Sequence, residues 1–150
     1  MESVKIGLAG LGTVGVGVIN LLEENAGLIA SRAGRPISIS VVSARDKSRD
    51  RGVDLSGFAW VDDAGEIAGR DDVDVVVELI GGSEGVARDL AHATLANGKA
   101  FVSANKALIA HHGEELAQIA QKNGAALAFE AAVAGGIPIL KALRHGRSAN

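Results

Sequence analysis

Short runs of apolar residues alternate along this chain with longer stretches in which apolar residues recur at the spacing of a helix. The short runs predict strands over residues 4–9, 37–44, 73–80, 99–103 and 126–129. Strands that alternate with helices are joined by right-handed crossovers and form a parallel sheet that is covered on both faces. The pattern therefore predicts the α/β class, with a doubly wound parallel sheet.

The stretches between the strands carry the periodicity and the end signals of helices. Gly34 stops the first helix, and Gly98 and Gly124 follow later helices in the manner of C-terminal caps. Helices are predicted over residues 13–25 with an extension to 31, from Asp62 or Asp63 to 68, over 83–97 with Ser83 as the N-cap, and over 107–110, 114–123 and 137–145. A short strand is expected over 58–60.

The first strand runs directly into the glycine pattern Gly10-x-Gly12-x-x-Gly15 and then into a helix. Gly10 permits the tight turn, Gly12 lets a pyrophosphate approach the backbone, and Gly15 lets the helix pack closely on the strand. The free N–H groups at the helix start attract phosphate. The pattern predicts a Rossmann-like domain whose residues Gly10, Leu11, Gly12, Thr13, Val14 and Gly15 bind a dinucleotide. The alternative is an ordinary tight turn between a strand and a helix.

The end of the second strand bears on the choice of cofactor. Ser43, Ala44 and Arg45 stand there, and no acidic residue occupies the strand tip. Arg45 is suited to pair with a 2′-phosphate while Ser43 donates a hydrogen bond, so NADP is favoured over NAD. A contact between Asp46 and a ribose is the other possibility, and it would allow the domain to use both NAD and NADP. The alternative is that residues 45–51 form a solvated charged loop.

Further candidates follow the next two strands. Ile80, Gly81 and Gly82 are expected beside the nicotinamide ribose, although a pair of turn glycines is the alternative. Ser103, Ala104, Asn105 and Lys106 stand at and after the end of the following strand and are also expected to bind the cofactor. Lys106 is the candidate catalytic residue, because a lysine at such a place can bind a substrate oxygen or move a proton; otherwise it is a solvated charge. Glu78 and Glu130 also end strands, where they orient a ligand or a lysine or cap a helix.

Composition removes several other classes of function. The net charge is −3 and aromatic residues make up only 3% of the chain, which argues against a nucleic-acid partner. No apolar run reaches the ~20 residues of a membrane span, and the start of the chain leaves no room for a signal peptide, so a cytoplasmic protein is expected. There are no cysteines. No metal site is expected, because the four histidines lack ligand spacing: His92, His111, His112 and His145.

Four segments together resemble homoserine dehydrogenase. They are Gly-Leu-Gly-Thr-Val-Gly-x-Gly-Val at 10–18, Val-Val-Glu-Leu-Ile-Gly-Gly at 76–82, Ser-Ala-Asn-Lys-Ala-Leu-Ile-Ala at 103–110 and Phe-Glu-Ala-Ala-Val-Ala-Gly-Gly-Ile-Pro-Ile at 129–139. The resemblance implies NAD(P)-dependent interconversion of L-homoserine and L-aspartate 4-semialdehyde, on the route to threonine, methionine and isoleucine. It implies that Lys106 is the active-site lysine, that Arg45 discriminates the 2′-phosphate, and that Gly136 lies near the nicotinamide.

Members of this family continue into a substrate-binding and dimerising domain. Residues 1–150 are therefore expected to be the dinucleotide-binding domain, truncated before that second domain and inactive alone. The full-length protein is expected to form a homo-oligomer and to reach its small-molecule substrate through the missing part. A nucleotide-sensing domain without catalysis remains an alternative, as does a phosphorylating aldehyde dehydrogenase whose cysteine nucleophile would lie beyond residue 150.

Overall fold

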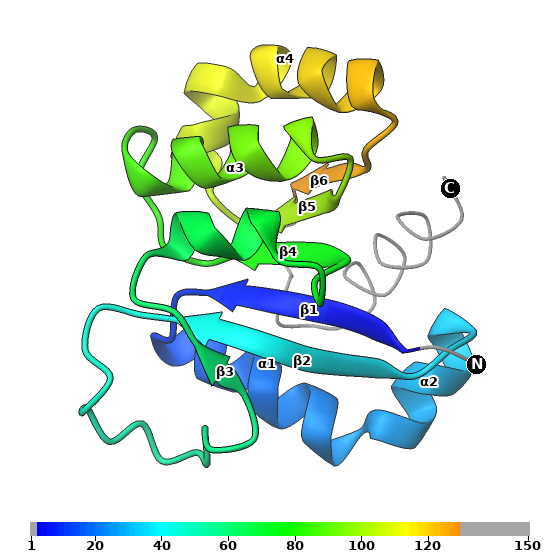
Figure 1. Cartoon of the computed structure of the whole chain (residues 1–150), viewed down its shortest axis with the longest axis vertical. Coiled ribbons are helices and arrows are strands. Elements are labelled where there is room, and N and C mark those ends of the chain that lie inside the picture. The colour runs from blue at the N-terminus through cyan, green and yellow to red at the C-terminus, as the bar shows by residue number, and fades with distance from the viewer. Residues whose placement is uncertain (1–2, 130–150) are drawn as a thin grey trace.

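Residues 3–129, which the computed structural model describes, form a six-stranded parallel sheet with helices on both faces (Figure 1). The strands are β1 (Val4–Ala9), β2 (Ile37–Ser43), β3 (Ala59–Trp60), β4 (Val75–Glu78), β5 (Ala100–Ser103) and β6 (Leu127–Phe129). Their spatial order is β3-β2-β1-β4-β5-β6. This is the Rossmann order, in which the direction of winding reverses beside β1. The predicted fold class is confirmed.

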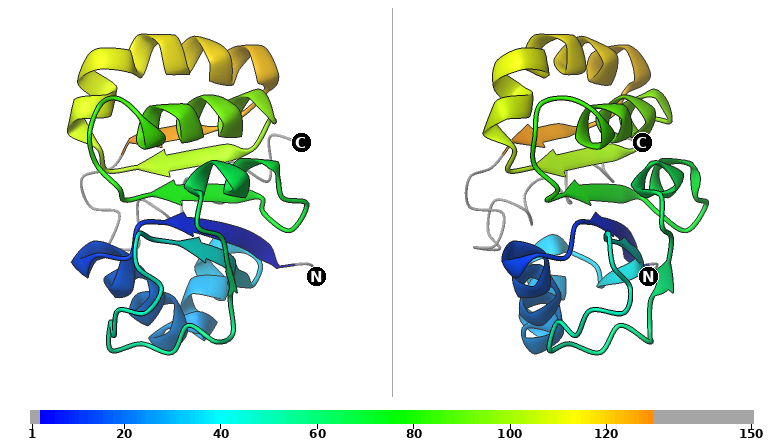
Figure 2. Two further views of the ribbon diagram at one scale, coloured as in Figure 1. Left: turned by 60° about the vertical axis from the view of Figure 1, so that its left-hand side comes forward. Right: turned by 90° about the vertical axis from the view of Figure 1, so that its left-hand side faces the viewer.

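The helices divide between the two faces (Figure 2). One face carries α1 (Thr13–Glu24) and α2 (Ala26–Ala33), and the other carries the 3-10 helix η1 (Ala64–Gly69), α3 (Val86–Ala96) and α4 (Lys106–Asn123). Along β4, Val75 and Val77 join the core of the first face with Leu22, while Val76 joins Leu90 on the second. Burial on both faces explains why the sequence of β4 is continuously apolar rather than alternating.

Two helix boundaries differ from the prediction. The first helical stretch is interrupted at Asn25, whose backbone N–H and side-chain amide both donate to the carbonyl oxygen of Leu21, at 3.1 and 3.2 Å. This closes α1 and lets α2 begin at Ala26. The two short helices expected over 107–110 and 114–123 are one helix, α4. Gly113 does not break it, since a glycine inside a helix costs only about 1 kcal/mol relative to alanine.

The helix starts also differ in part. Ser83 is not a cap: α3 begins at Val86, after Gly85, and no side chain of a described residue caps it. Asp63 is the cap of η1, where its carboxylate accepts a hydrogen bond from the N–H of Gly65 at 2.9 Å. Of the two aspartates that were expected to cap this helix, Asp63 is therefore the N-cap, and it bonds an N–H two residues further along the chain.

The glycine turn after β1 is built on two close approaches. Gly10 has φ +103°, and a Cβ at this residue would lie 2.9 Å from the carbonyl atoms of Leu79, in the loop after β4. A Cβ on Gly15 would lie 2.2 Å from the carbonyl oxygen of Gly10. The first turn of α1 therefore packs directly against the backbone of Gly10, with no space for a side chain at Gly15. A Cβ on Gly12 would meet no described atom within 4 Å, so this side of the turn is open.

Gly15→Ala is expected to lower the free energy of unfolding by about 1–3 kcal/mol, because the added methyl group overlaps the Gly10 carbonyl and must displace α1. Gly17→Ala is the matched control, since it lies in the same helix with no described atom within 4 Å of its Cβ position. There alanine should raise the free energy of unfolding by up to about 1 kcal/mol. Urea denaturation followed by circular dichroism measures both, and equal effects of the two substitutions would contradict this explanation of the turn.

Candidate functional site

The carboxyl ends of four neighbouring strands lie level with one another. In the sheet register, Ala9 is opposite both Ser43 and Glu78, and Glu78 is opposite Ser103. Because neighbouring strands lie about 4.8 Å apart, these four strand ends form a row of roughly 14 Å. The candidate residues that follow them in sequence therefore share one edge of the sheet.

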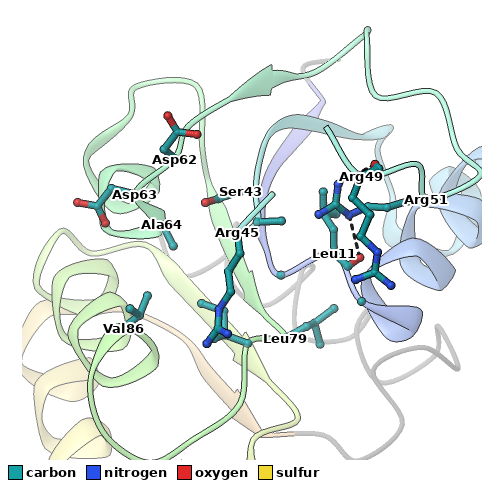
Figure 3. A pocket seen from close by; sticks show the side chains of 14 residues that line it. Leu11, Ser43, Arg45, Arg49, Arg51, Asp62, Asp63, Ala64, Leu79 and Val86 are labelled. Carbon is teal, nitrogen blue, oxygen red and sulfur yellow. Dashed lines mark hydrogen bonds between the residues drawn. The ribbon is translucent and has the colours of Figure 1, made fainter. Parts of the chain in front are cut away.

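A pocket of about 500 Å³ lies beyond the ends of β1, β2 and β4 (Figure 3). Of the residues expected to bind the cofactor, seven line it: Gly10, Leu11, Gly12, Ser43, Ala44, Arg45 and Ile80. Sequence reasoning did not assign Arg49, Arg51, Asp62, Asp63, Ala64, Leu79 or Val86 to the pocket, although they line it as well. The pocket thus joins the glycine turn to the strand end that was expected to read the cofactor.

The other expected residues that the structure describes lie along the same edge but do not line this pocket. Thr13, Val14 and Gly15 form the first turn of α1. Gly81 and Gly82 follow the pocket residue Ile80, with φ values of +92° and +82° that explain why glycine stands at both places. Ser103, Ala104, Asn105 and Lys106 join the end of β5 to the start of α4. Gly136 and Glu130 lie outside the described residues.

The start of α1 is open to an anion. Gly12 is the N-cap, no side chain of a described residue bonds the free N–H groups, and the first turn contains no acidic residue. The first turn of any helix has N–H groups without partners in the helix, and its dipole adds a partial positive charge. With the open space at Gly12, these groups offer a site of the kind that binds phosphate.

Arginine side chains surround the pocket. Figure 3 shows Arg45 extending from the end of β2 toward Leu79. Among the described residues, no hydrogen bond or salt bridge engages the guanidinium group of Arg45 or of Arg49. Arg51 is anchored: its Nε donates to the Leu11 carbonyl oxygen at 3.3 Å. Two cations thus remain available to an anionic group that enters the pocket.

The acidic residues near the pocket have other partners. Asp46 does not line it, because its carboxylate closes a turn by accepting from the N–H and the hydroxyl group of Ser48, at 2.9 and 2.6 Å. These two bonds, with the charges of Arg51 and Arg49 nearby, hold the pKa of Asp46 below its ordinary value. Asp62 lines the pocket and accepts from the indole N–H of Trp60 at 2.9 Å. Asp46 is therefore poorly placed for the ribose contact considered above.

A buried carboxylate connects the loops after β4 and β5. Glu78 is fully buried, and its Oε2 accepts from the N–H groups of Ile80 and Gly81, at 2.6 and 3.0 Å. Its Oε1 accepts from the Ser103 hydroxyl group at 2.7 Å and from the Asn105 side-chain amide at 3.3 Å. We refer to these five residues as the Glu78 network.

Asn105 extends the connection in two directions. Its amide nitrogen also donates to the carbonyl oxygen of Gly82 at 2.6 Å, and its amide oxygen accepts from the N–H of Leu108 at 3.0 Å. The second bond makes Asn105 the N-cap of α4, a role that sequence reasoning did not assign. The Ser-x-x-Glu type of capping signal is missing here, so only the asparagine before the helix hinted at it.

Lys106 is the first residue of α4 and is exposed. No hydrogen bond or salt bridge joins its ammonium group to any residue in the described part of the chain. A cation at the start of a helix opposes the helix dipole, so its position does not stabilise α4. The ammonium group stands free on the same edge of the sheet as the glycine turn.

Two of the histidines contact acidic side chains. His112 of α4 contacts two acids, with Nε2 at 2.6 Å from Glu84 in the loop before α3 and Nδ1 at 3.3 Å from Glu115 in its own helix. His92 also lies near Glu115, at 3.4 Å. Within residues 3–129 no such cluster is arranged to hold a metal ion, and no helix is long and apolar enough to cross a membrane. The hydrogen bond from His112 lowers the pKa of Glu84.

Comparison with known proteins agrees with the architecture. The family model described as homoserine dehydrogenase, NAD binding domain, matches residues 10–130. The homoserine dehydrogenase of Pseudomonas aeruginosa is 49% identical over 150 residues, which is 100% of this chain and 34% of that protein. The enzyme of Neisseria gonorrhoeae is 48% identical over the same length, with the same coverage.

A crystal structure of homoserine dehydrogenase from Thiobacillus denitrificans superimposes with a TM-score of 0.81 and 44% identity, covering 99% of this chain and 34% of that one. The chain thus spans about a third of the length of the relatives it matches. The family model covers most of the chain, and the sheet order and the glycine turn agree with it. The chain belongs to the homoserine dehydrogenase family, of which it corresponds to the NAD-binding domain.

Proposed function

We propose that the chain binds NADP or NAD across the carboxyl ends of its strands, as the dinucleotide-binding domain of a homoserine dehydrogenase. The full-length enzyme would interconvert L-homoserine and L-aspartate 4-semialdehyde. The observation that carries the proposal is the open glycine turn at the uncapped start of α1, on the same edge of the sheet as a free lysine, Lys106. The names of the relatives supply homoserine as a substrate, and oxidation of its alcohol carbon by hydride removal gives the 4-semialdehyde.

The adenosine half of the cofactor is assigned to the described pocket. The diphosphate would lie against the N–H groups that follow Gly10 in the turn, where Gly12 leaves space; the N–H of Gly10 itself donates to the Ser43 carbonyl oxygen at 2.8 Å. The ribose 2′-phosphate of NADP would meet Arg45 and Ser43, which line the pocket together. The unpaired guanidinium groups of Arg45 and Arg49 support NADP over NAD, because a charged phosphate is their natural partner.

The nicotinamide half is assigned to the loops after β4 and β5. Ile80, Gly81 and Gly82 would contact the ribose, and Ser103, Ala104, Asn105 and Lys106 would border the ring and the substrate; Gly136 is proposed to lie nearby. When bound, the nicotinamide supplies hydride chemistry at the aldehyde carbon of the substrate. Lys106 would bind the aldehyde oxygen and donate a proton to it as that oxygen becomes a hydroxyl group. In the reverse reaction the same nitrogen accepts the proton.

The relatives are about three times as long as this chain, so substrate contacts are proposed to come mainly from the part that the chain does not cover. We propose that the chain alone binds nucleotide without appreciable turnover, because catalytic groups act as a unit. The full-length enzyme is proposed to be a cytoplasmic homo-oligomer in the synthesis of threonine, methionine and isoleucine.

Consumption of NADPH by the full-length enzyme, with L-aspartate 4-semialdehyde as substrate, tests the proposal. We expect turnover with this substrate and binding of NADPH by the isolated chain. Nucleotide binding without turnover in the full-length protein would indicate a sensing domain instead. No binding of either nucleotide would contradict the proposal at its base.

Lys106→Ala in the full-length enzyme is expected to lower kcat by about 10²–10⁴-fold, because the proton transfer loses its donor. The dissociation constant for NADPH should change little, since the pocket does not include this side chain. Lys122→Ala removes an exposed lysine from the last turn of the same helix and should leave kcat unchanged. Unchanged turnover in Lys106→Ala would show that this lysine is not the proton donor.

Arg45→Ala is expected to weaken NADPH binding by about 10–100-fold, the loss typical of a hydrogen bond to a charged group. NADH binding should change by no more than about threefold, because NADH has no 2′-phosphate to lose a contact. Arg32→Ala removes the same charge from α2, away from the pocket, and serves as the control. Fluorescence titration measures the dissociation constants of NADPH and NADH for the wild type and for both variants. Equal losses for NADPH and NADH would rule out recognition of the 2′-phosphate by Arg45.

A further inference from the structure

We propose that Glu78 is a positioning residue that holds the loops after β4 and β5 in one arrangement and thereby places Lys106 beside the nicotinamide. The proposal rests on the function proposed above for Lys106. Glu78 itself does not touch the ammonium group, and it is not among the residues that line the described pocket. Its effect would pass through the backbone of the two loops.

The hydrogen bonds of the carboxylate match its charge. Four groups of the described residues donate to it, two backbone N–H groups to Oε2 and the Ser103 hydroxyl and Asn105 amide to Oε1. An ionised carboxylate accepts at both oxygens and has no proton to place. The amide group of a glutamine would instead bring two N–H bonds against groups that already donate. The site is therefore built for a carboxylate.

The fold by itself does not require a carboxylate here. The three preceding residues of β4 are valines, and they are buried like Glu78. A buried charge must recover a large desolvation cost, and an apolar residue of similar size is often equally compatible with stability. The stability of the core therefore does not explain a fully bonded carboxylate at the end of an otherwise apolar strand. We attribute it instead to the candidate site, which lies at this edge of the sheet.

The network connects the two segments proposed to surround the nicotinamide. Glu78 binds the backbone of Ile80 and Gly81, while Asn105 binds Gly82 and, in the same orientation, caps α4. Within the loop after β5, the N–H of Asn105 donates to the Ser103 hydroxyl oxygen at 3.0 Å, which fixes Asn105 relative to the strand end.

Since Lys106 directly follows Asn105, the position of its backbone depends on these bonds. The side chains that make them are almost fully enclosed: Glu78 and Ser103 are 0% exposed and Asn105 is 9% exposed. Loss of one acceptor would leave enclosed donors unpaired and let the two loops move apart. A shift of about 1 Å between reacting groups can cost about a hundredfold in rate, so small movements matter here.

Glu78→Gln in the full-length enzyme is the test, because it keeps the shape of the side chain and removes one acceptor. We expect kcat to fall by about 10–100-fold. The deuterium isotope effect on kcat, with NADPH deuterated at the transferred position, should rise because the hydride step becomes slower than product release. Binding of adenosine 2′,5′-bisphosphate should change by less than about twofold, since Ile80 is the one residue of the Glu78 network that lines the pocket this compound fills, and neither Glu78 nor Asn105 lines it.

Val76→Ala is the matched control for a loss of stability alone. Val76 is a buried neighbour in the same strand, and its side chain packs in the core rather than at the strand end. It should lower the melting temperature and leave kcat and the isotope effect as in the wild type. Ser103→Ala, which removes one of the four donors and keeps the carboxylate, covers the case in which Glu78→Gln does not fold; it should lower kcat in the same direction by a smaller factor.

The outcomes separate this inference from the proposed function. A wild-type enzyme without homoserine dehydrogenase activity would overturn both. An active wild type with unchanged kcat and isotope effect in Glu78→Gln and Ser103→Ala would overturn the positioning role alone. That role would also be overturned if Glu78→Gln weakened binding of the bisphosphate and lowered kcat together, as a general loss of structure would.

Discussion

The level ending of four neighbouring parallel strands is the constraint on which the rest of the site depends. Ala9, Ser43, Glu78 and Ser103 lie opposite one another across the sheet, so each loop that follows them opens onto the same edge. A shift of register by a single residue in one strand would move each of its side chains to the opposite face of the sheet, so that a different side chain would be buried at the strand end. The apolar runs on both faces hold this register, and the site is assembled from what comes next in each loop.

The edge divides into two parts with different chemistry. Toward β2 the pocket offers backbone N–H groups and unpaired guanidinium groups, which suit phosphates. Toward β5 a buried carboxylate network supports a free lysine, Lys106, at the start of α4. Both parts depend on glycines with positive φ. Gly10 lets the turn lie close to the loop after β4, and Gly81 and Gly82 let that loop continue beyond the pocket. The proposal thus gives nucleotide binding and proton transfer to separate groups on one edge of the sheet.

The fold and the glycine turn could be predicted because their causes are local. Periodicity identifies the strands and helices, and the steric demand for glycine at Gly10 and Gly15 follows from the strand-turn-helix context. The Glu78 network could not be predicted, because it joins residues about 25 positions apart that only the sheet register brings together. Ser83 was wrongly expected to cap α3 for a different reason: a serine before a helical stretch is a local signal, and the positive φ of Gly85 starts the helix later.

The most direct test of the central claim is nuclear magnetic resonance of the ¹⁵N-labelled chain titrated with NADPH. We predict that the largest changes in amide chemical shift occur at Gly12, Thr13 and Gly15, where N–H groups would meet the diphosphate. Smaller changes should follow at Gly81, and none at Lys99, which directly precedes β5 and so lies at the opposite edge of the sheet. Saturation without shifts in the glycine turn, or with the largest shifts near Lys99, would show that the nucleotide does not bind at the carboxyl ends of the strands.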